Sequence, residues 1–401
     1  MTNHTPLSEG GSAPAPAPVA RLASLDALRG FDMFCIVGGT QIVRSLVNAS
    51  GIPSLAWLPK QFEHVPWEGF RFIDLIFPLF LFMIGVSIPY ALGKRQARGD
   101  SLGQIYRHIV VRVLVLFTFG LMINGRLLTY DVQKIQIYSV LQMLAFGYAV
   151  AAVFFLHLRW RWQVAATVLM LVGYWALLAF VPGPGHVIGV VAPHCNVGDW
   201  LNDWILGERW QGQFRFGWIL AILGHAATAM LGVFAGQLLR SERTARSKLL
   251  WLGGLGAGCL LAGVFWGGWV AQWFPGLELF GVDWSRWPIW SPIIKNRWTS
   301  AFALYAGGWS YLLLALFYGV IDVWGFRRWA FPFSVIGMNA LFAYLANGLC
   351  GGAFYAVANA FLGGLKPYAG AWHGAILATG SFAALWCLLW YMYRNKTFIR
   401  V

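Results

Sequence analysis

The chain has 401 residues, of which 59% are hydrophobic and only 11% are charged, and its formal net charge is +14. Soluble domains are about 45–50% apolar and about 25% charged, so this composition excludes a soluble globular protein and predicts an all-α, polytopic membrane protein. The positive charge is divided among several loops rather than gathered on one surface with exposed aromatics, which argues against nucleic-acid binding. The five cysteines lie mostly in apolar runs and predict no disulfide framework.

Residues 1–20 are mostly Ser, Gly, Ala and Pro, and we expect a disordered tail because such a segment cannot bury a core. Residues 21–401 are expected to form a single transmembrane domain. Its ten apolar runs of spanning length lie at about 24–47, 70–92, 105–124, 136–157, 162–181, 217–239, 248–270, 299–321, 331–350 and 371–393. The run Ala353–Leu362 is too short to cross and predicts a re-entrant or interfacial segment.

Lys and Arg gather in alternate loops, from Lys94–Arg98 after the second run to the C-terminal segment 394–400. The positive-inside rule assigns these loops to the cytoplasm, and with ten spans both termini are then cytoplasmic and His64 lies on the outer face. The outer loops 182–216 and 271–298 are long and rich in Trp, and we expect lids or binding loops there. Anchoring at the membrane interface is the alternative role for these Trp side chains, and stacking on sugar rings is a further hypothesis.

A polar segment with a histidine between two carboxylates stands directly before the second apolar run. Glu63, His64 and Glu68 lie in this segment, and Asp74 follows within the run. Ionisable groups at a membrane face are candidates for function. His64 can act as a general base near neutral pH or as an acyl-accepting nucleophile, with Glu63, Glu68 or Asp74 orienting its ring. A capping histidine at an interfacial turn is the structural alternative.

Other polar residues carry weaker signals. Asp26 and Arg29 are three residues apart on one helix face, and they form either an interfacial ion pair or a substrate-facing pair. Lys295 and Asn296 stand at the mouth of the eighth run, as part of an anion clamp or of a snorkelling anchor. Asn339 lies in an apolar run, where amides commonly bond to neighbouring helices.

One outer loop contains His186, His194, Cys195 and Asp199, which are residue types that suit zinc. Their spacing fits no compact ligand pattern. No metal is therefore expected.

Seven motifs follow one another along the chain. They are Arg21–Gly30, His64-x-x-Trp67-x-Gly69, Asp74–Phe82 with Gly85 and Ser87, Ile137–Gln142, Leu231–Gly236, Lys295–Ser300 and Gly337–Asn339. Together they resemble the heparan-α-glucosaminide N-acetyltransferase family and its bacterial relatives, over nearly everything from about residue 21 onward. The resemblance implies a multi-pass transferase that takes an acetyl group from cytoplasmic acetyl-CoA and delivers it across the membrane, in the lysosomal members to the amine of a terminal glucosamine.

The resemblance also implies site residues. His64 matches the essential lumenal histidine of the family. The lysosomal members carry an active-site asparagine at the end of the first helix, whereas the matching stretch here, Val37–Gln41, has none. Thr40 or Gln41 is expected to replace it as a hydrogen-bond donor, unless the site has moved to another acceptor or chemistry.

The sequence thus predicts an acetyltransferase of the bacterial inner membrane, with His64 as a base or as an acetyl carrier. The expected partners are the lipid bilayer, acetyl-CoA as co-substrate and a small sugar or glycan acceptor, and a homodimer is left open. The residues expected to contact substrate or acetyl-CoA are Asp26, Arg29, Thr40, Gln41, Trp67, Lys295, Asn296 and Asn339.

Two other classes of protein compete with the enzyme. A transporter or a lipid or sugar carrier is favoured by the Gly-rich spans and by two prolines, Pro78 and Pro89, in one run, because broken helices build binding sites in transporters. An inactive scaffold is the third interpretation, and the missing asparagine supports it.

Overall fold

The computed structural model describes residues 22–124, 127–131, 135–183, 191–192, 195–207, 219–269, 278–279, 282–283 and 290–399. The expected disordered tail 1–20 lies outside the described residues, as do His186, His194 and parts of the loops 182–216 and 271–298.

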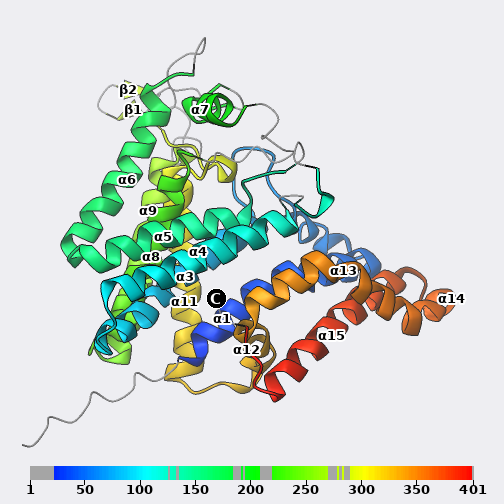
Figure 1. The fold of residues 1–401 in the computed structure, drawn as a ribbon. Coiled ribbons are helices and arrows are strands. Elements are labelled where there is room, and N and C mark those ends of the chain that lie inside the picture. The colour runs from blue at the N-terminus through cyan, green and yellow to red at the C-terminus, as the bar shows by residue number, and fades with distance from the viewer. Residues whose placement is uncertain are drawn as a thin grey trace, which may run out of the picture.

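The described chain is almost entirely helical (Figure 1). The helices are α1 (Ala23–Phe34), α2 (Thr40–Ser50), α3 (Phe72–Ala97), α4 (Leu102–Ile123), α5 (Val140–His157), α6 (Trp160–Phe180), α7 (Val197–Leu206), α8 (Ile222–Arg240), α9 (Ala245–Trp266), α11 (Ser300–Phe317), α12 (Phe331–Met338), α13 (Ala340–Leu362), α14 (Lys366–Ala369) and α15 (His373–Arg394). A π-helical segment, Cys35–Gly39, joins α1 to α2. The strands β1 (Glu278–Leu279) and β2 (Val282–Asp283) pair antiparallel within the stretch 271–298, where we expected a lid or binding loop.

Within the described residues, eight helical segments are long and apolar enough to cross a membrane. The all-α, polytopic fold class is therefore confirmed. The ten spans expected from the sequence differ from these eight segments in two places. The run 24–47, which forms α1 and α2, contains several charged residues and is not among the eight segments. The eighth segment, Ala340–Arg394, contains two long helices, α13 and α15.

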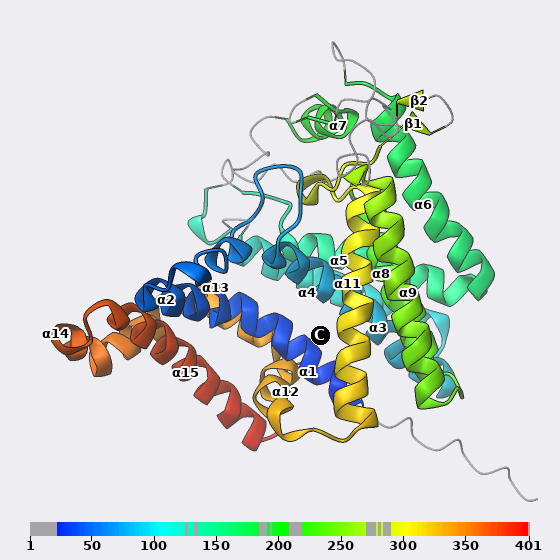
Figure 2. The ribbon, with the colours of Figure 1, turned by 180° about the vertical axis from the view of Figure 1, so that it is seen from behind.

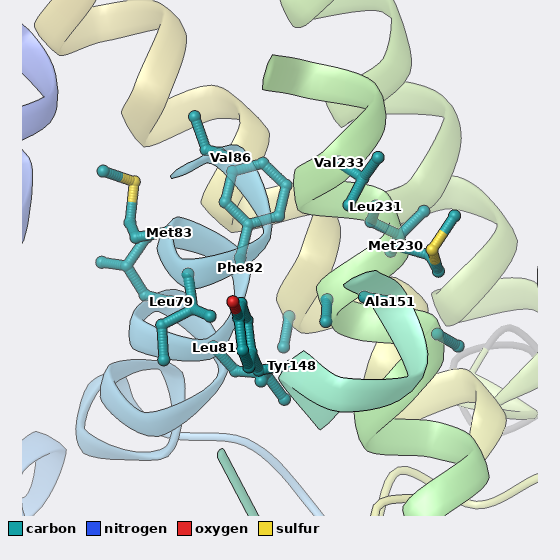
Figure 3. Packing of buried hydrophobic residues seen from close by; sticks show 14 of the residues in the cluster. Leu79, Leu81, Phe82, Met83, Val86, Tyr148, Ala151, Met230, Leu231 and Val233 are labelled. Atoms are coloured by element: carbon teal, nitrogen blue, oxygen red, sulfur yellow. The ribbon is translucent and has the colours of Figure 1, made fainter. Parts of the chain in front are cut away.

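The core is built around α3, which packs against α8, α5 and α11. Figure 3 shows Leu81 of α3 beside Tyr148 of α5. Glycines bring two of these backbones together, since a Cβ on Gly85 would lie 2.0 Å from the carbonyl oxygen of Ala229. Small residues allow such close approach between membrane helices, where packing rather than water drives association.

A second group of helices lies beside this bundle and consists of α1, α2, α12, α13 and α15 (Figures 1 and 2). Here α1 packs on α12, and α15 packs on α13 and α2. Gly30 of α1 allows this contact, because a Cβ there would lie 1.7 Å from the carbonyl oxygen of Phe333.

The predicted boundaries near the C-terminus are wrong. The span expected at 331–350 is divided at Asn339, whose φ of −126° and ψ of 36° interrupt the helix between α12 and α13. The segment Ala353–Leu362 is not re-entrant but forms the second half of the 23-residue helix α13. The expectation rested on the shortness of this run, but the helix continues through Gly351 and Gly352, because glycine is tolerated inside apolar membrane helices, which satisfy their own backbone hydrogen bonds.

Candidate functional site

Two segments far apart in the sequence are held together at the start of α3. The backbone N–H of Gly69 donates to the carbonyl of Ile293 at 2.9 Å, and Glu68 and Ile294 form an antiparallel bridge. Gly69 has φ of +125°, a backbone conformation that favours glycine. The pairing places Lys295, the residue after this bridge, beside His64.

Asp74 is the centre of the resulting cluster. It lies in the first turn of α3, where the helix dipole favours a negative charge, and its side chain has no exposed surface. Its Oδ2 accepts the backbone N–H of Arg71 at 3.1 Å. Its Oδ1 is 2.7 Å from Nδ1 of His64 and accepts from Nζ of Lys295 at 3.2 Å.

These distances favour one tautomer of His64. An ionised carboxylate only accepts hydrogen bonds, so its contact with Nδ1 requires a proton on that nitrogen. Nδ1 of His64 and Nζ of Lys295 then both donate to Oδ1 of Asp74 and make no hydrogen bond to each other, although they are 2.9 Å apart. The other ring nitrogen, Nε2, then carries the free lone pair. The side chain of His64 is 59% exposed, and a base at Nε2 is therefore accessible to a substrate.

Lys295 is the third member of the cluster, and its side chain is only 9% exposed. Nζ lies 2.9 Å from Nδ1 of His64. Burial lowers the pKa of the Lys295 amine below its usual value, and the neighbouring Asp74 carboxylate opposes this effect. The amine is thus bound to Asp74 within the protein, so Lys295 is not a snorkelling anchor.

A cavity of about 590 Å³ opens next to this cluster, where the two groups of helices meet. His64, Lys295 and Thr40 line it together with a largely apolar wall that includes Ile76 and Phe80. Polar side chains also reach the cavity; they are Asn124, Gln136, Tyr138, Ser139 and Tyr344. Such a volume suits a small molecule or the extended arm of a larger one.

The other acidic residues near His64 have different partners. Glu63 is 3.4 Å from Arg44 and 3.9 Å from Arg71, through its two carboxylate oxygens. Glu68 has an exposed side chain and contributes its backbone to the bridge with Ile294. Of the carboxylates predicted to orient His64, the structure brings Asp74 into hydrogen-bond distance.

Trp67 belongs to a neighbouring cluster. Its Nε1 donates to the carbonyl of Val191 at 3.0 Å, and the guanidinium of Arg297 lies 5.0 Å from the centre of its ring. Arg297 is buried and pairs with Asp199 at 2.5 Å. Asn296, half-buried between Lys295 and Arg297, accepts a hydrogen bond from Arg297 through its backbone carbonyl at 3.4 Å.

Two further candidates lie away from His64, near the start of the first helix. Asp26 and Arg29 pair at 3.6 Å, and Arg29 also donates to Oγ of Ser87 at 2.9 Å. These contacts join α1 to α3. Neither Asp26 nor Arg29 lines the cavity that contains His64.

Asn339 also lies outside that cavity and holds the C-terminal segment. Its Nδ2 donates to the carbonyl of Thr397 at 3.1 Å, and its Oδ1 accepts the backbone N–H of Ile399 at 3.0 Å. Gln41 donates to Ser45 at 3.4 Å and lines a separate cavity.

No group of three possible metal ligands occurs among the residues that the structure describes. Of the four residues considered for zinc, Asp199 is paired with Arg297, and Cys195 is a free, partly buried thiol.

Sequence reasoning did not foresee two features of the site. The first is the direct contact of Lys295 with both His64 and Asp74, for which the signals were a basic residue at the mouth of a span and its place in the Lys295–Ser300 motif. The second is the hydrogen bond from Asn124 to the hydroxyl of Tyr344 at 3.2 Å, which joins α4 to α13 at the cavity wall. A polar residue at the end of an apolar run was the only available signal for Asn124.

The fold and the cluster define a polytopic, all-α membrane protein with a buried carboxylate that binds both a histidine and a lysine beside a cavity. Residues 21–182 match a family model described as a domain of unknown function, DUF5009. This part of the chain includes His64 and Asp74.

Two curated animal proteins are similar to most of the chain. The heparan-alpha-glucosaminide N-acetyltransferase of Mus musculus is 27% identical over 379 residues, which are 82% of this chain and 54% of the mouse protein. The protein of the same name from Homo sapiens is 27% identical over 432 residues, which are 95% of this chain and 60% of the human protein. The chain is therefore a distant relative of these acetyltransferases, and it spans little more than half of their length.

Proposed function

We propose that this protein is a membrane acetyltransferase that transfers an acetyl group from acetyl-CoA to an amino sugar or a related glycan acceptor. The observation that carries the proposal is the bond of His64 to the buried Asp74, at the edge of a cavity of about 590 Å³. The distant relationship to N-acetyltransferases supports the same chemistry.

In the proposed reaction, Nε2 of His64 removes a proton from the acceptor amine or hydroxyl. The acceptor then attacks the thioester carbonyl, and the carbon–sulfur bond breaks as the new amide or ester bond forms. The protonated His64 returns its proton to the departing CoA thiolate, so the histidine ends the cycle unchanged. In the covalent alternative, Nε2 attacks the thioester carbonyl, and the carbon–sulfur bond breaks to release the CoA thiolate. The acceptor then attacks the acetyl group on Nε2, the carbon–nitrogen bond to the ring breaks, and the acceptor's proton passes to the thiolate.

Asp74 and Lys295 have complementary roles in this scheme. Asp74 fixes the tautomer of His64 and stabilises the imidazolium that forms. Lys295 neutralises the buried carboxylate, and its amine lies close enough to His64 to influence charge that develops there.

We further propose that acetyl-CoA enters from the cytoplasm and that His64 works on the outer side of a bacterial inner membrane. The alternation of basic loops supports this orientation, with both termini in the cytoplasm. Arg and Lys on the cytoplasmic side would offer contacts to the phosphates of CoA.

The experiment is acetyl-CoA consumption by purified protein in nanodiscs with glucosamine as acceptor. Wild type is compared with His64→Ala and with His157→Ala, a control histidine that contacts Tyr106 and lies outside the His64 cluster. We expect turnover in wild type and His157→Ala and none in folded His64→Ala. Turnover by folded His64→Ala would refute the proposed mechanism.

The transporter alternative loses part of its support. Although α3 contains Pro78 and Pro89, it runs as one helix from Phe72 to Ala97, so it is not a broken helix. Accumulation of labelled sugar in proteoliposomes without acetyl-CoA would nevertheless favour a transporter.

A further inference from the structure

A second cavity has a volume of about 650 Å³, and His64 does not line it. Residues of α2, α13 and α15 line it, together with the π-helical segment Cys35–Gly39. Ile36 and Thr40 line both cavities, so the second cavity adjoins the one at His64 along the turn that contains them.

The polar side chains that line the second cavity are uncharged, and they alternate with apolar ones such as Val37 and Leu377. Gln41, Ser45, Asn347 and Ser381 present amides and hydroxyls, and no Asp, Glu, Lys or Arg is among the described lining residues. The side chains of Asn347 and Ser381 make no hydrogen bond to another described residue. Thr40 donates its hydroxyl proton to the carbonyl of Cys35 at 2.7 Å, which leaves its oxygen lone pairs able to accept.

Aromatic side chains complete this second cavity. Tyr355 and Phe382 line it. Phe382 packs directly against Gly38, where a Cβ would lie 2.8 Å from its ring. Amides and hydroxyls next to aromatic rings can bind a ring that has hydroxyl groups at its edge and an apolar face. Cavities that bind small molecules are commonly about 300–1,000 Å³, so the volume is sufficient for one or two such rings.

We propose that this second cavity binds the acceptor through an uncharged, hydroxyl-bearing sugar ring, with the reacting group directed past Thr40 toward His64. This inference rests on the proposed acetyltransferase function and adds a location for the acceptor. The first cavity, whose wall is largely apolar, then remains for the acetyl donor.

The first test measures binding without catalysis. Ser381→Cys is introduced into a chain whose two exposed cysteines, Cys350 and Cys387, are replaced by serine, and the protein is placed in nanodiscs. The rate of reaction with the membrane-permeant reagent N-ethylmaleimide is measured with and without N-acetylglucosamine. Thr379→Cys is the matched control, because Thr379 is an exposed residue on the same helix that does not line the cavity.

We expect N-acetylglucosamine to slow labelling of Ser381→Cys severalfold and to leave Thr379→Cys unchanged. No protection of Ser381→Cys, or equal slowing at both positions, would overturn the inference. If N-acetylglucosamine protects Ser381→Cys from labelling but the wild-type protein transfers no acetyl group, the binding site is supported and the proposed chemistry is refuted. The experiment therefore distinguishes failure of the binding site from failure of the acetyltransferase proposal.

The second test uses kinetics. Replacing Asn347 by leucine should raise the KM for glucosamine about tenfold, as expected for one lost hydrogen bond, and leave the KM for acetyl-CoA unchanged. An unchanged KM for glucosamine, or an equal rise for both substrates, would contradict the placement of the acceptor.

Discussion

Nζ of Lys295 lies 2.9 Å from Nδ1 of His64, although 231 positions separate the two residues in the chain. The contact exists because both side chains meet at one oxygen of Asp74. A histidine whose ring is fixed by a buried carboxylate is a common arrangement for a general base, and here a lysine supplies the positive charge that compensates the carboxylate.

Replacing Asp74 by asparagine should lower kcat about 10²–10⁴-fold, because the amide no longer selects the His64 tautomer that leaves Nε2 basic. The KM for acetyl-CoA should change little. Steady-state kinetics in nanodiscs check this expectation. Glu63→Gln is the control, since Glu63 pairs with Arg44 and Arg71, and an equal loss in both variants would contradict a special role for Asp74.

Asp74 and Lys295 should be strongly coupled in stability. Lys295→Met leaves the buried carboxylate without its cation and should cost about 3–5 kcal/mol, whereas adding Asp74→Asn should recover part of that loss. Unfolding in detergent of the wild type, both single variants and the double variant gives the coupling free energy.

The pair Arg95–Asp100 provides the matched control for this cycle. Its atoms are 3.1 Å apart, close to the 3.2 Å of the buried pair, but its side chains are 28% and 23% exposed. We expect a coupling of about 0–1 kcal/mol for this pair. A coupling for Lys295 and Asp74 no larger than that would show that burial does not strengthen their interaction.

Stability should rise with pH in the alkaline range because of Lys295. Burial lowers the pKa of this amine from 10.5, so between its lowered pKa and 10.5 the unfolded chain binds more protons than the folded protein. The free energy of unfolding therefore increases with pH across that window, and Lys295→Met should lack this increase. Melting temperatures measured from pH 7 to 10.5 should show the gap between wild type and Lys295→Met widening with pH, whereas the control Lys60→Met, at an exposed lysine, should keep the wild-type trend.

Gly85 should not tolerate alanine. A Cβ there would lie 2.0 Å from the carbonyl oxygen of Ala229, so Gly85→Ala must separate α3 from α8 and should cost about 1–3 kcal/mol. In contrast, Gly253→Ala on α9 meets no atom within 4 Å and should be neutral or stabilising. Thermal unfolding of the two variants distinguishes close packing from a general effect of removing glycine.

The sequence predicts the helices well, because runs of about 20 apolar residues have few alternatives in a membrane. It also predicts that His64 and Asp74 belong to one site, since only ten positions separate them. It does not predict that Lys295 joins them. That contact depends on the bridge between Glu68 and Ile294, and no local pattern encodes the pairing of two irregular segments.

The assignment of Glu63 illustrates the same limit. Proximity in the sequence suggests that it orients His64, yet Arg44 of α2 and Arg71 are its partners in the folded protein. Similarly, the role of Asn339 in holding Thr397 and Ile399 depends on the return of the chain after α15. Local patterns identify polar residues in apolar surroundings, whereas tertiary structure selects their partners.

The distance in sequence between Asp74 and Lys295, 221 positions, has a consequence for biogenesis. During synthesis, the carboxylate enters the membrane region long before its lysine has been translated. The cluster can form only after the segment preceding α11 has emerged and docked on Gly69. A growing chain that contains only the first helices therefore carries an incomplete site, and completion of the bundle is also the step that assembles the His64 cluster.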